Sequence, residues 1–268
     1  VRCGEELARL RNQYLPLDHG ESWQVHAATD NVIVSRFPLL QRTQELPVRY
    51  PLPQLGLPDF HYGQAMCLVD IPDEQCQVDF YVIAMHNKSR SGEESIRLRQ
   101  RQSDSIVRWI RKIRRPDMAS SIPVETPIII LGDMNVLASE PADPAHHLTT
   151  LLTGNIVDEK AFGPDFPLDW DGTNLIEVKP RHNAREKDFY TWRVDDLPFP
   201  PGALDRIIYT DSVLSVNHSF VLNTTIMTRQ ELDDNGLLST DALWDGKAGN
   251  FDHLPLVADS SIRISQAQ

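Results

Sequence analysis

Four short segments of this 268-residue sequence place polar side chains beside runs of apolar residues, where a protein core has no need of them. Together they supply two imidazoles, three carboxylates and several amide, amine or hydroxyl groups: His86, Asn87, Lys88 and Ser89; Asp133 and Asn135; Asp205; Asp252 and His253. Singly, each has an ordinary structural explanation, such as a satisfied histidine, a turn-forming aspartate or one half of a buried ion pair. As a set, they suit the hydrolysis of phosphate esters.

The chemistry follows from what each group can do at a phosphate. Carboxylates hold a hard cation such as Mg²⁺, with Mn²⁺ as an alternative, and the cation offsets the charge of the phosphate. Imidazole and amide donors stabilise the oxygens of the five-coordinate transition state. The sequence contains no Gly-x-Ser-x-Gly, no zinc-peptidase pattern and no glycine-rich nucleotide loop. We therefore expect a metal-dependent phosphoric ester hydrolase.

Strands and helices must position these side chains. Short apolar or alternating runs predict strands over 30–37, 64–71, 78–86, 127–131, 189–193, 204–209, 213–222 and 254–264. The runs at 64–71 and 78–86 lie close enough for an antiparallel hairpin, and the apolar run at 127–131 is typical of a strand buried on both faces. Helices are predicted over 5–15, 93–115 and 144–152, and the proline-rich stretch 47–58 is expected to be a surface loop.

One strand-rich α/β domain covering residues 1–268 is the resulting prediction, since there is no internal repeat, low-complexity tract or break in composition. The longest aliphatic run, at 128–131, is far below the roughly 20 residues that span a bilayer, which excludes a transmembrane protein. We expect a soluble monomer, for which secretion or a periplasmic location is open. Cys67 and Cys76 flank a turn and could pair, but two unpaired thiols are favoured over a disulfide.

In their order along the chain, the polar segments resemble the endonuclease/exonuclease/phosphatase superfamily. The matching motifs are Ser35-Arg36-Phe37-Pro38, His86-Asn87-Lys88-Ser89, Gly132-Asp133-Met134-Asn135, Leu204-Asp205-Arg206-Ile207 and Asp252-His253-Leu254-Pro255. The superfamily includes deoxyribonucleases, abasic-site endonucleases, neutral sphingomyelinases and inositol-polyphosphate 5-phosphatases. The resemblance implies a four-layered α/β sandwich, with two mixed, mostly antiparallel sheets face to face and helices outside.

The resemblance also implies catalytic roles. Asp133 and Asn135 match the pair that positions or deprotonates the attacking water and binds the scissile phosphate. His253 matches the imidazole that acts on the phosphate or the nucleophile, and Asp205 matches the carboxylate that orients it. His86 matches a second imidazole, either a phosphate ligand or the general acid for the leaving oxygen. Because coupled His and Asp groups share their titration, the identity of the general base is left open.

Contacts to the substrate and the metal are implied in the same way. Asp252 matches an acid at or near the metal, which it would hold together with Asp133. The substrate-binding set is His86, Asn87, Lys88 and Asn135.

One part of the family pattern has no counterpart upstream. Members carry an Asn on the first strand and a metal-binding Glu on the next, ahead of the Ser-Arg-x-Pro strand. Here Glu5 and Glu6 fall in the predicted helix, and only Glu21, in a loop, is a loosely placed substitute. We expect that the domain lacks its first strands, with 1–21 unassigned; a degenerate or relocated metal site is the alternative. Fewer oxygen ligands would weaken the binding of Mg²⁺.

The net charge of −12 disfavours a tight, sequence-indifferent nucleic-acid binder, because cationic residues supply the affinity of such proteins. A solvated surface is favoured over a phosphate-tracking face for the basic residues of the helix at 93–115, namely Arg97, Arg99, Arg101, Arg108, Arg111, Lys112, Arg114 and Arg115. The sequence therefore favours a small or lipid-like phosphate ester, or a general phosphodiesterase. A nuclease and a non-catalytic binding member are the alternatives.

Overall fold

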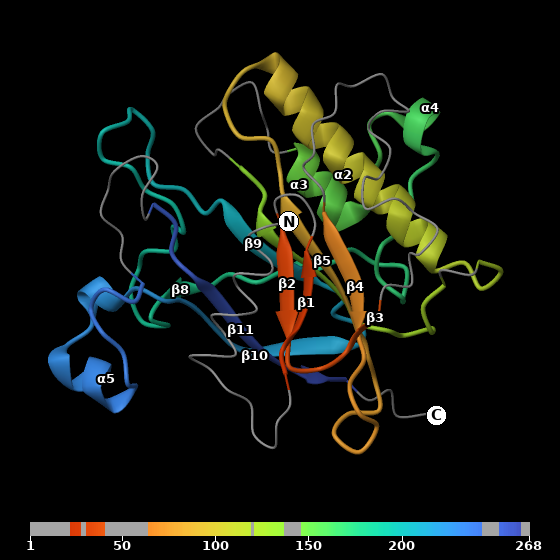
Figure 1. Cartoon of the computed structure of the whole chain (residues 1–268). Coiled ribbons are helices and arrows are strands. Elements are labelled where there is room, and N and C mark those ends of the chain that lie inside the picture. Colours follow the sequence, from red (N-terminus) through yellow and green to blue (C-terminus); the bar gives the residue numbers. More distant parts are fainter. Residues whose placement is uncertain are drawn as a thin grey trace.

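The computed structural model describes residues 22–27, 31–40, 64–118, 121–136, 146–242 and 252–263. A six-stranded mixed sheet forms the centre of the fold (Figure 1). In spatial order its strands are β3 (Leu39–Leu40), β4 (Ala65–Val69), β5 (Phe80–His86), β6 (Ile128–Asp133), β9 (Asp205–Tyr209) and β7 (Ile176–Glu177). Neighbouring strands run antiparallel except β5 and β6, which are parallel, so the ends of β5 and β6 and the start of β9 share one edge of the sheet.

Two smaller sheets accompany the central one. The strands β8 (Arg181–His182), β10 (Leu214–Val221) and β11 (Leu256–Ile262) form the second sheet, in which β10 pairs antiparallel with β11 and parallel with β8. The third is the antiparallel hairpin of β1 (Gln24–Ala27) and β2 (Val32–Ser35). Apolar side chains of the central and second sheets pack against one another, so these two sheets lie face to face.

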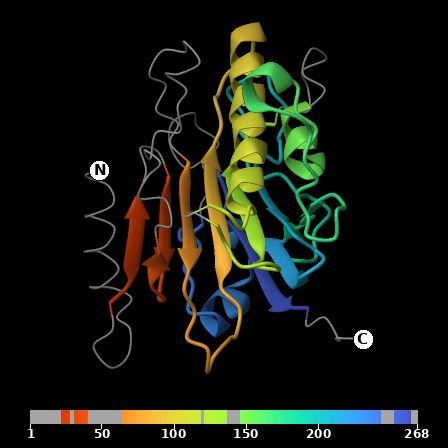
Figure 2. The same ribbon diagram turned by 90° about the vertical axis from the view of Figure 1, so that its right-hand side faces the viewer.

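Helices cover the other face of the central sheet (Figure 2). They are α2 (Glu93–Ile113), α3 (His146–Thr153) and the short α4 (Glu159–Phe162). The 3₁₀ turn η3 (Thr224–Ile226) and α5 (Arg229–Asp234) follow β10. None of the helices that the structure describes combines the length and apolar character that a membrane span requires.

Strand β6 shows why the central sheet is stable. Ile128 and Ile130 are fully buried against the helices, whereas Ile129 and Leu131 pack on the opposite face against the other sheets. Burying one such side chain contributes about 2 kcal/mol. The predicted burial of this run on both faces is therefore confirmed.

The arginines of α2 hold a neighbouring segment instead of forming a solvated face. Arg101 Nη1 lies 3.3 Å from a carboxylate oxygen of Asp158, and Arg108, Arg111 and Arg114 donate to backbone carbonyls between 161 and 169. The expectation of a solvated surface is therefore wrong for Arg101, Arg111 and Arg114, which are partly buried, and for Arg99, which is fully buried, whereas Arg108 is exposed. Long guanidinium groups suit this task because each can donate to several carbonyl oxygens at once.

The predicted mixed α/β sandwich is confirmed, and so is the antiparallel hairpin of β4 and β5. The predicted strand at 189–193 is wrong, since this segment makes only isolated bridges, through Trp192. Sequence reasoning missed β1, β3, β7 and β8, which are four residues long or shorter. Cys67 and Cys76 are free thiols, as favoured. The predictions for 5–15, 47–58, Glu5, Glu6 and Glu21 lie outside the described residues.

Candidate active site

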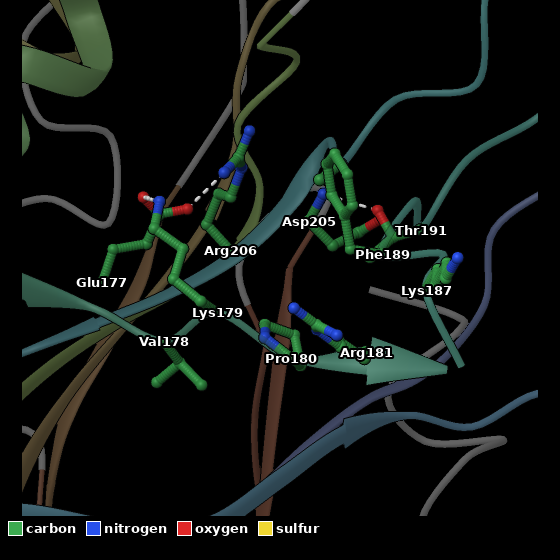
Figure 3. Close-up of a pocket in the computed structure, with 11 residues that line it drawn as sticks. Glu177, Val178, Lys179, Pro180, Arg181, Lys187, Phe189, Thr191, Asp205 and Arg206 are labelled. Atoms are coloured by element: carbon green, nitrogen blue, oxygen red, sulfur yellow. Dashed lines mark hydrogen bonds and ion pairs between the residues drawn. The ribbon is translucent and has the colours of Figure 1, made fainter. Parts of the chain in front are cut away.

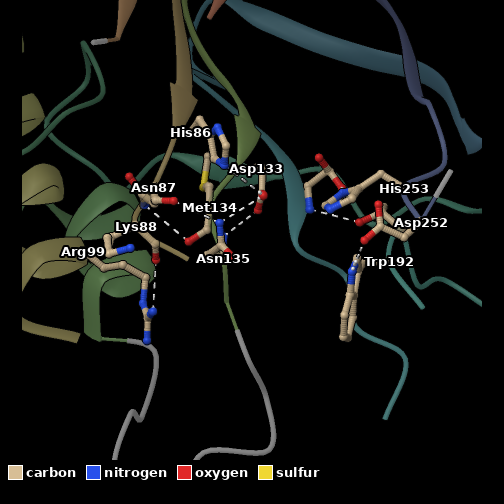
Figure 4. Close-up of polar contacts among 12 residues, drawn as sticks. His86, Asn87, Lys88, Arg99, Asp133, Met134, Asn135, Trp192, Asp252 and His253 are labelled. Carbon is tan, nitrogen blue, oxygen red and sulfur yellow. Dashed lines mark hydrogen bonds and ion pairs between the residues drawn. The ribbon is translucent and has the colours of Figure 1, made fainter. Parts of the chain in front are cut away.

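Three of the predicted residues occupy directly opposed positions on three neighbouring strands. His86 ends β5, Asp133 ends β6 and Asp205 begins β9; the strand register pairs His86 with Asp133 and Asp133 with Asp205. A fourth residue, His253, precedes β11, and its Nδ1 lies 2.8 Å from Oδ2 of Asp205. His86 Nε2 lies 3.7 Å from Oδ2 of Asp133. His86, Asp133 and Asp205 thus form a row on this edge of the sheet, and His253 extends the row beyond Asp205. The row has an imidazole at each end and two carboxylates between them, and its two imidazoles lie on either side of Asp133 and Asn135 in Figure 4.

A cavity of about 600 Å³ opens over this row. The residues that line it are His86, Ser89, Arg90, Ser91, Asp133, Asn135, Trp192, Leu197, Phe199, Leu204, Asp252 and His253. Five of the predicted site residues therefore face one space although they are far apart in the sequence. Asp205 does not line this cavity, but it is joined to it by its hydrogen bond to His253.

A tight turn after β6 aims Asn135 at the cavity. The carboxylate of Asp133 accepts the backbone N–H of Asn135 at 2.8 Å and the side-chain amide of Asn135 at 3.0 Å. The same amide donates to the carbonyl oxygen of Asn87 at 2.9 Å. Asn135 has a φ of 50°, in the left-handed region that Asn tolerates better than most residues. The orientation of the Asn135 amide is therefore set by the backbone as well as by its partners.

Glycine is required immediately before this turn. Gly132 has a φ of 126°, and a Cβ added there would lie 2.0 Å from the carbonyl oxygen of Met85 on the paired strand. The absence of a side chain lets β5 and β6 approach closely enough to place His86 next to Asp133. The Gly in the Gly-Asp-x-Asn motif therefore has a packing reason.

Burial and charge shift the pKa values of two members of the row. Burial raises the pKa of Asp133, and the negative charge of Asp205 raises it further, against the opposing effect of His253 and His86. Burial by itself would lower the pKa of His253. The hydrogen bond and charge of Asp205, with the charges of Asp133 and Asp252, outweigh burial and raise that pKa above its usual value. The cavity floor is thus a concentrated acidic field that favours a bound cation or proton.

Asn87 and Lys88 lie beside the cavity and do not line it. Asn87 is fully buried. Its backbone N–H donates to the carbonyl oxygen of Asp133 at 2.8 Å, and its side-chain amide donates to the carbonyl oxygen of Met134 at 3.3 Å. The side-chain oxygen of Asn87 has no hydrogen-bond partner among the described residues. The backbone N–H of Lys88 donates to Gln102 at 2.9 Å. Both residues are therefore placed to hold the turn after β6 and the loop after β5.

Helix α2 supplies a support that sequence reasoning missed. Arg99 is fully buried, and its Nη1 donates to the carbonyl oxygens of Lys88 at 3.1 Å and Arg90 at 2.8 Å. These bonds fasten the loop that contributes Ser89, Arg90 and Ser91 to the cavity. The helical pattern gave no signal for this role, because Arg99 belongs to a run of arginines.

The segment at 191–193 is a second missed contribution. The hydroxyl oxygen of Thr191 accepts the backbone N–H groups of Leu204 at 3.1 Å and Asp205 at 2.9 Å. The indole N–H of Trp192 donates to Oδ2 of Asp252 at 3.1 Å. This segment therefore orients two of the predicted carboxylates. Its aromatic and β-branched residues predict a strand and give no signal for these contacts.

The cavity offers a divalent cation few protein ligands. Among the described residues there is no group of three or more His, Cys, Asp or Glu side chains that could hold a metal ion. Asp133 and Asp252 both line the cavity. Mg²⁺ commonly binds through one or two protein carboxylates together with phosphate oxygens of the substrate and water. The site fits that mode of binding and does not fit a cage built only of protein ligands.

No family model matches the chain. It is 22% identical to Nocturnin of Drosophila melanogaster over 145 residues, which cover 52% of this chain and 20% of that protein. The chain therefore spans about one fifth of the length of this curated relative.

Solved structures with low sequence identity are also similar. The catalytic domain of human Nocturnin with bound sulfate has a TM-score of 0.39 and 19% identity, covering 75% of this chain and 54% of that one. Sphingomyelinase C of Streptomyces griseocarneus has a TM-score of 0.42 and 16% identity, covering 71% and 56%. TDP2 of D. rerio with a single-strand DNA product has a TM-score of 0.49 and 14% identity, covering 93% and 80%. Nocturnin belongs to the endonuclease/exonuclease/phosphatase superfamily, so the resemblance predicted from the motifs is confirmed.

Proposed function

We propose that this chain, which resembles the endonuclease/exonuclease/phosphatase superfamily in its motifs and its α/β fold, hydrolyses phosphate esters by metal-assisted attack of water. The observation that carries the proposal is the row of His86, Asp133 and Asp205 on one sheet edge, extended by His253 through its bond to Asp205. His86, Asp133 and His253 line a single cavity. The row supplies proton-transfer groups at both ends and acidic groups between them. A phosphorus atom above Asp133 would have one imidazole on each side.

Different members of the row carry out the two proton transfers. The oxygen of water attacks phosphorus while the bond from phosphorus to the ester oxygen breaks. His253 or Asp133 takes the proton that the water loses, and His86 gives a proton to the leaving oxygen. Asp205 occupies Nδ1 of His253, which leaves Nε2 as the ring nitrogen available to the cavity. Asp205 is thus a positioning residue that fixes the orientation and tautomer of the imidazole.

Asn135 and the metal would bind the phosphate. The side-chain amide of Asn135 lines the cavity, and both of its N–H groups are used, by Asp133 and by the carbonyl oxygen of Asn87. It would donate to a phosphate oxygen by exchanging its bond to Asp133 when that carboxylate binds the metal. Asp133 and Asp252 would hold Mg²⁺, or Mn²⁺ in its place, and the bound cation would offset the negative charge of the phosphate. Asn87 and Lys88 do not line the cavity, and the side chain of Asn87 and the backbone of Lys88 support the turn and the loop. We therefore assign them positioning roles instead of substrate contact.

Bis(4-nitrophenyl) phosphate tests the proposal because its hydrolysis needs no recognition of a particular alcohol. We expect release of nitrophenol with millimolar Mg²⁺ or Mn²⁺, loss of activity with EDTA, and loss in Asp133→Ala and Asn135→Ala variants. No hydrolysis of this ester or of 4-nitrophenyl phosphate, from a folded chain with either metal, would contradict the proposal. That outcome would favour a member that uses the same cavity only for binding.

A nucleic-acid substrate is a second candidate. Trp192 and Phe199 both line the cavity, and aromatic side chains can stack on bases. A nuclease would nick supercoiled plasmid or shorten a single-stranded oligonucleotide, with activity that falls steeply as salt rises. A small-molecule or lipid phosphoesterase would leave both substrates intact while it hydrolyses the nitrophenyl ester.

A further inference from the structure

A second cavity, of about 380 Å³, adjoins the candidate active site at Asp205 (Figure 3). It runs along the exposed edge of the central sheet, from the end of β7 to the start of β9. Four of the side chains that line it are cationic: Lys179, Arg181, Lys187 and Arg206. This concentration of positive charge contrasts with the net charge of −12 of the whole chain.

The four cations differ in how their charge is used. Arg206 and Lys179 both form ion pairs with Glu177, which is itself nearly buried. Arg181 and Lys187 are exposed, and neither forms an ion pair with any residue in the described part of the chain. The positive charge of these two side chains is therefore available to an anion that enters the cavity.

An exposed aromatic ring completes the cavity. Phe189 is 63% exposed, an unusual environment for a large apolar side chain, and it lies beside Thr191 and Asp205 in Figure 3. Exposed aromatic rings next to cationic side chains are the arrangement by which proteins stack nucleobases while they bind the adjoining phosphates. The ring is also placed directly next to the row that would carry out hydrolysis.

The loop that carries Lys187 and Phe189 is firmly anchored. His182 is buried, and its backbone N–H donates to the carbonyl oxygen of Asp188 at 2.9 Å. Its Nε2 lies 2.7 Å from the carbonyl oxygen of Tyr190. The side chain of Asn183 makes two hydrogen bonds of 3.0 Å with the backbone of Asn223, which follows the end of β10. The exposure of Phe189 is therefore a fixed feature of the loop.

We propose that this cavity is a nucleotide subsite, in which a base stacks on Phe189 and a phosphate binds Arg181 and Lys187. The inference rests on the proposed function and narrows it, because it makes the substrate a nucleotide or a single-stranded nucleic acid. The scissile ester lies over Asp133, and the unit in the subsite is attached to it across Asp205. A phosphate ester without a base would leave Phe189 without a partner.

Calorimetric titration tests the subsite without turnover, so a chain that hydrolyses nothing still gives a result. The probes are adenosine 3′,5′-bisphosphate, ribose 5-phosphate and inositol 1,4-bisphosphate, each with and without magnesium. The variants are Phe189→Ala, Phe189→Leu and the double change Arg181→Ala with Lys187→Ala. Leu238→Ala and Lys160→Ala are matched controls, because both side chains are exposed and lie outside the cavity.

We expect the nucleoside bisphosphate to bind at least about fivefold more tightly than ribose 5-phosphate, with most of that preference lost in both Phe189 variants. The double variant should weaken binding of the bisphosphate at least about fivefold and flatten its dependence on salt. The controls should match the wild type. Unchanged affinity in all Phe189 and cationic variants would overturn the subsite. Tighter binding of the inositol phosphate than of the nucleotide, unaffected by Phe189→Ala, would overturn the assignment to a nucleotide.

Discussion

Nδ1 of His253 lies 2.8 Å from Oδ2 of Asp205, although 48 residues separate the two along the chain. The segment around Trp192 makes this contact possible. Trp192 forms isolated bridges with both Gly202 and His253, and so joins the chain ahead of β9 to the chain ahead of β11. The short segment around Trp192, which has no regular secondary structure, therefore brings Asp205 and His253 together.

The Asp205→Asn change should lower the pKa of His253. Burial alone lowers this pKa, and the hydrogen bond and charge of Asp205 are the main causes that raise it. Asn keeps the shape but removes the charge. Titration of the His253 ring by NMR should show a midpoint at lower pH than in the wild type, and any limb of the pH–rate profile that reports His253 should shift the same way.

The same change gives a prediction for stability. A histidine with a raised pKa in the folded state stabilises the protein below its unfolded pKa, and this stabilisation is lost as pH rises through the folded pKa. The stability lost on Asp205→Asn should therefore be largest below about pH 6.5 and shrink above it. Denaturant titrations at several pH values measure this, and a deficit that is constant with pH would argue against the coupling.

The Gly132→Ala change should disrupt the site from within the sheet. The new Cβ would contact the carbonyl oxygen of Met85 at 2.0 Å, in addition to the strain of a positive φ. We expect a loss of about 2–5 kcal/mol in the free energy of unfolding and a strong loss of turnover. Gly172→Ala is the matched control: Gly172 has a φ of 81° with no atom within 4 Å of the added Cβ. It should cost only about 1–2 kcal/mol. Equal effects at the two positions would refute the packing explanation.

The Arg99→Met change should loosen the loop after β5. Met retains most of the apolar volume but cannot donate to the carbonyl oxygens of Lys88 and Arg90. We expect a loss of about 3 kcal/mol in stability and, because the loop lines the cavity, a rate reduction of at least about tenfold. Exposed Arg97 on the same helix provides the control, since Arg97→Met should leave both nearly unchanged. Normal turnover in Arg99→Met, measured well below its melting temperature, would exclude the positioning role.

Magnesium should stabilise the folded chain through Asp133 and Asp252. A cation at one hundred times its dissociation constant adds about 2.7 kcal/mol, which a thermal-unfolding scan detects. The Asp252→Asn variant should lose most of this shift, whereas Asp259→Asn, on the exposed edge of β11, should retain it. The shift should also increase with pH as Asp133, whose pKa is raised, becomes deprotonated. If Asp252→Asn retains the full shift, the cation binds elsewhere.

The sequence predicted the strands that carry the site residues better than the way they meet. The apolar run that became β6 and the hairpin of β4 and β5 were recognisable, because their patterns extend over five residues or more. The short strands β7 and β8 depend on pairing with distant partners, which a local pattern does not encode.

In the candidate site, the sequence predicted the residues that line the cavity but not the residues that support them. The motifs indicated His86, Asp133, Asn135, Asp252 and His253, all of which line one cavity. Local sequence did not predict that Arg99 would be buried beneath a loop, because burial of a guanidinium depends on carbonyl oxygens supplied elsewhere in the fold. For the same reason, no pattern predicted that Arg101 to Arg114 would fasten the segment after α3.

Comparing two histidines in one assay tests the central claim most directly. His253 pairs with Asp205 at the cavity, and His218 pairs with Asp259 on the exposed edge of the second sheet. For the hydrolysis of bis(4-nitrophenyl) phosphate with magnesium, His253→Ala should lower kcat/KM by about 10²–10⁴-fold, whereas His218→Ala should stay within about twofold of the wild type. Equal rates for His253→Ala and the wild type, both folded and active, would contradict the account.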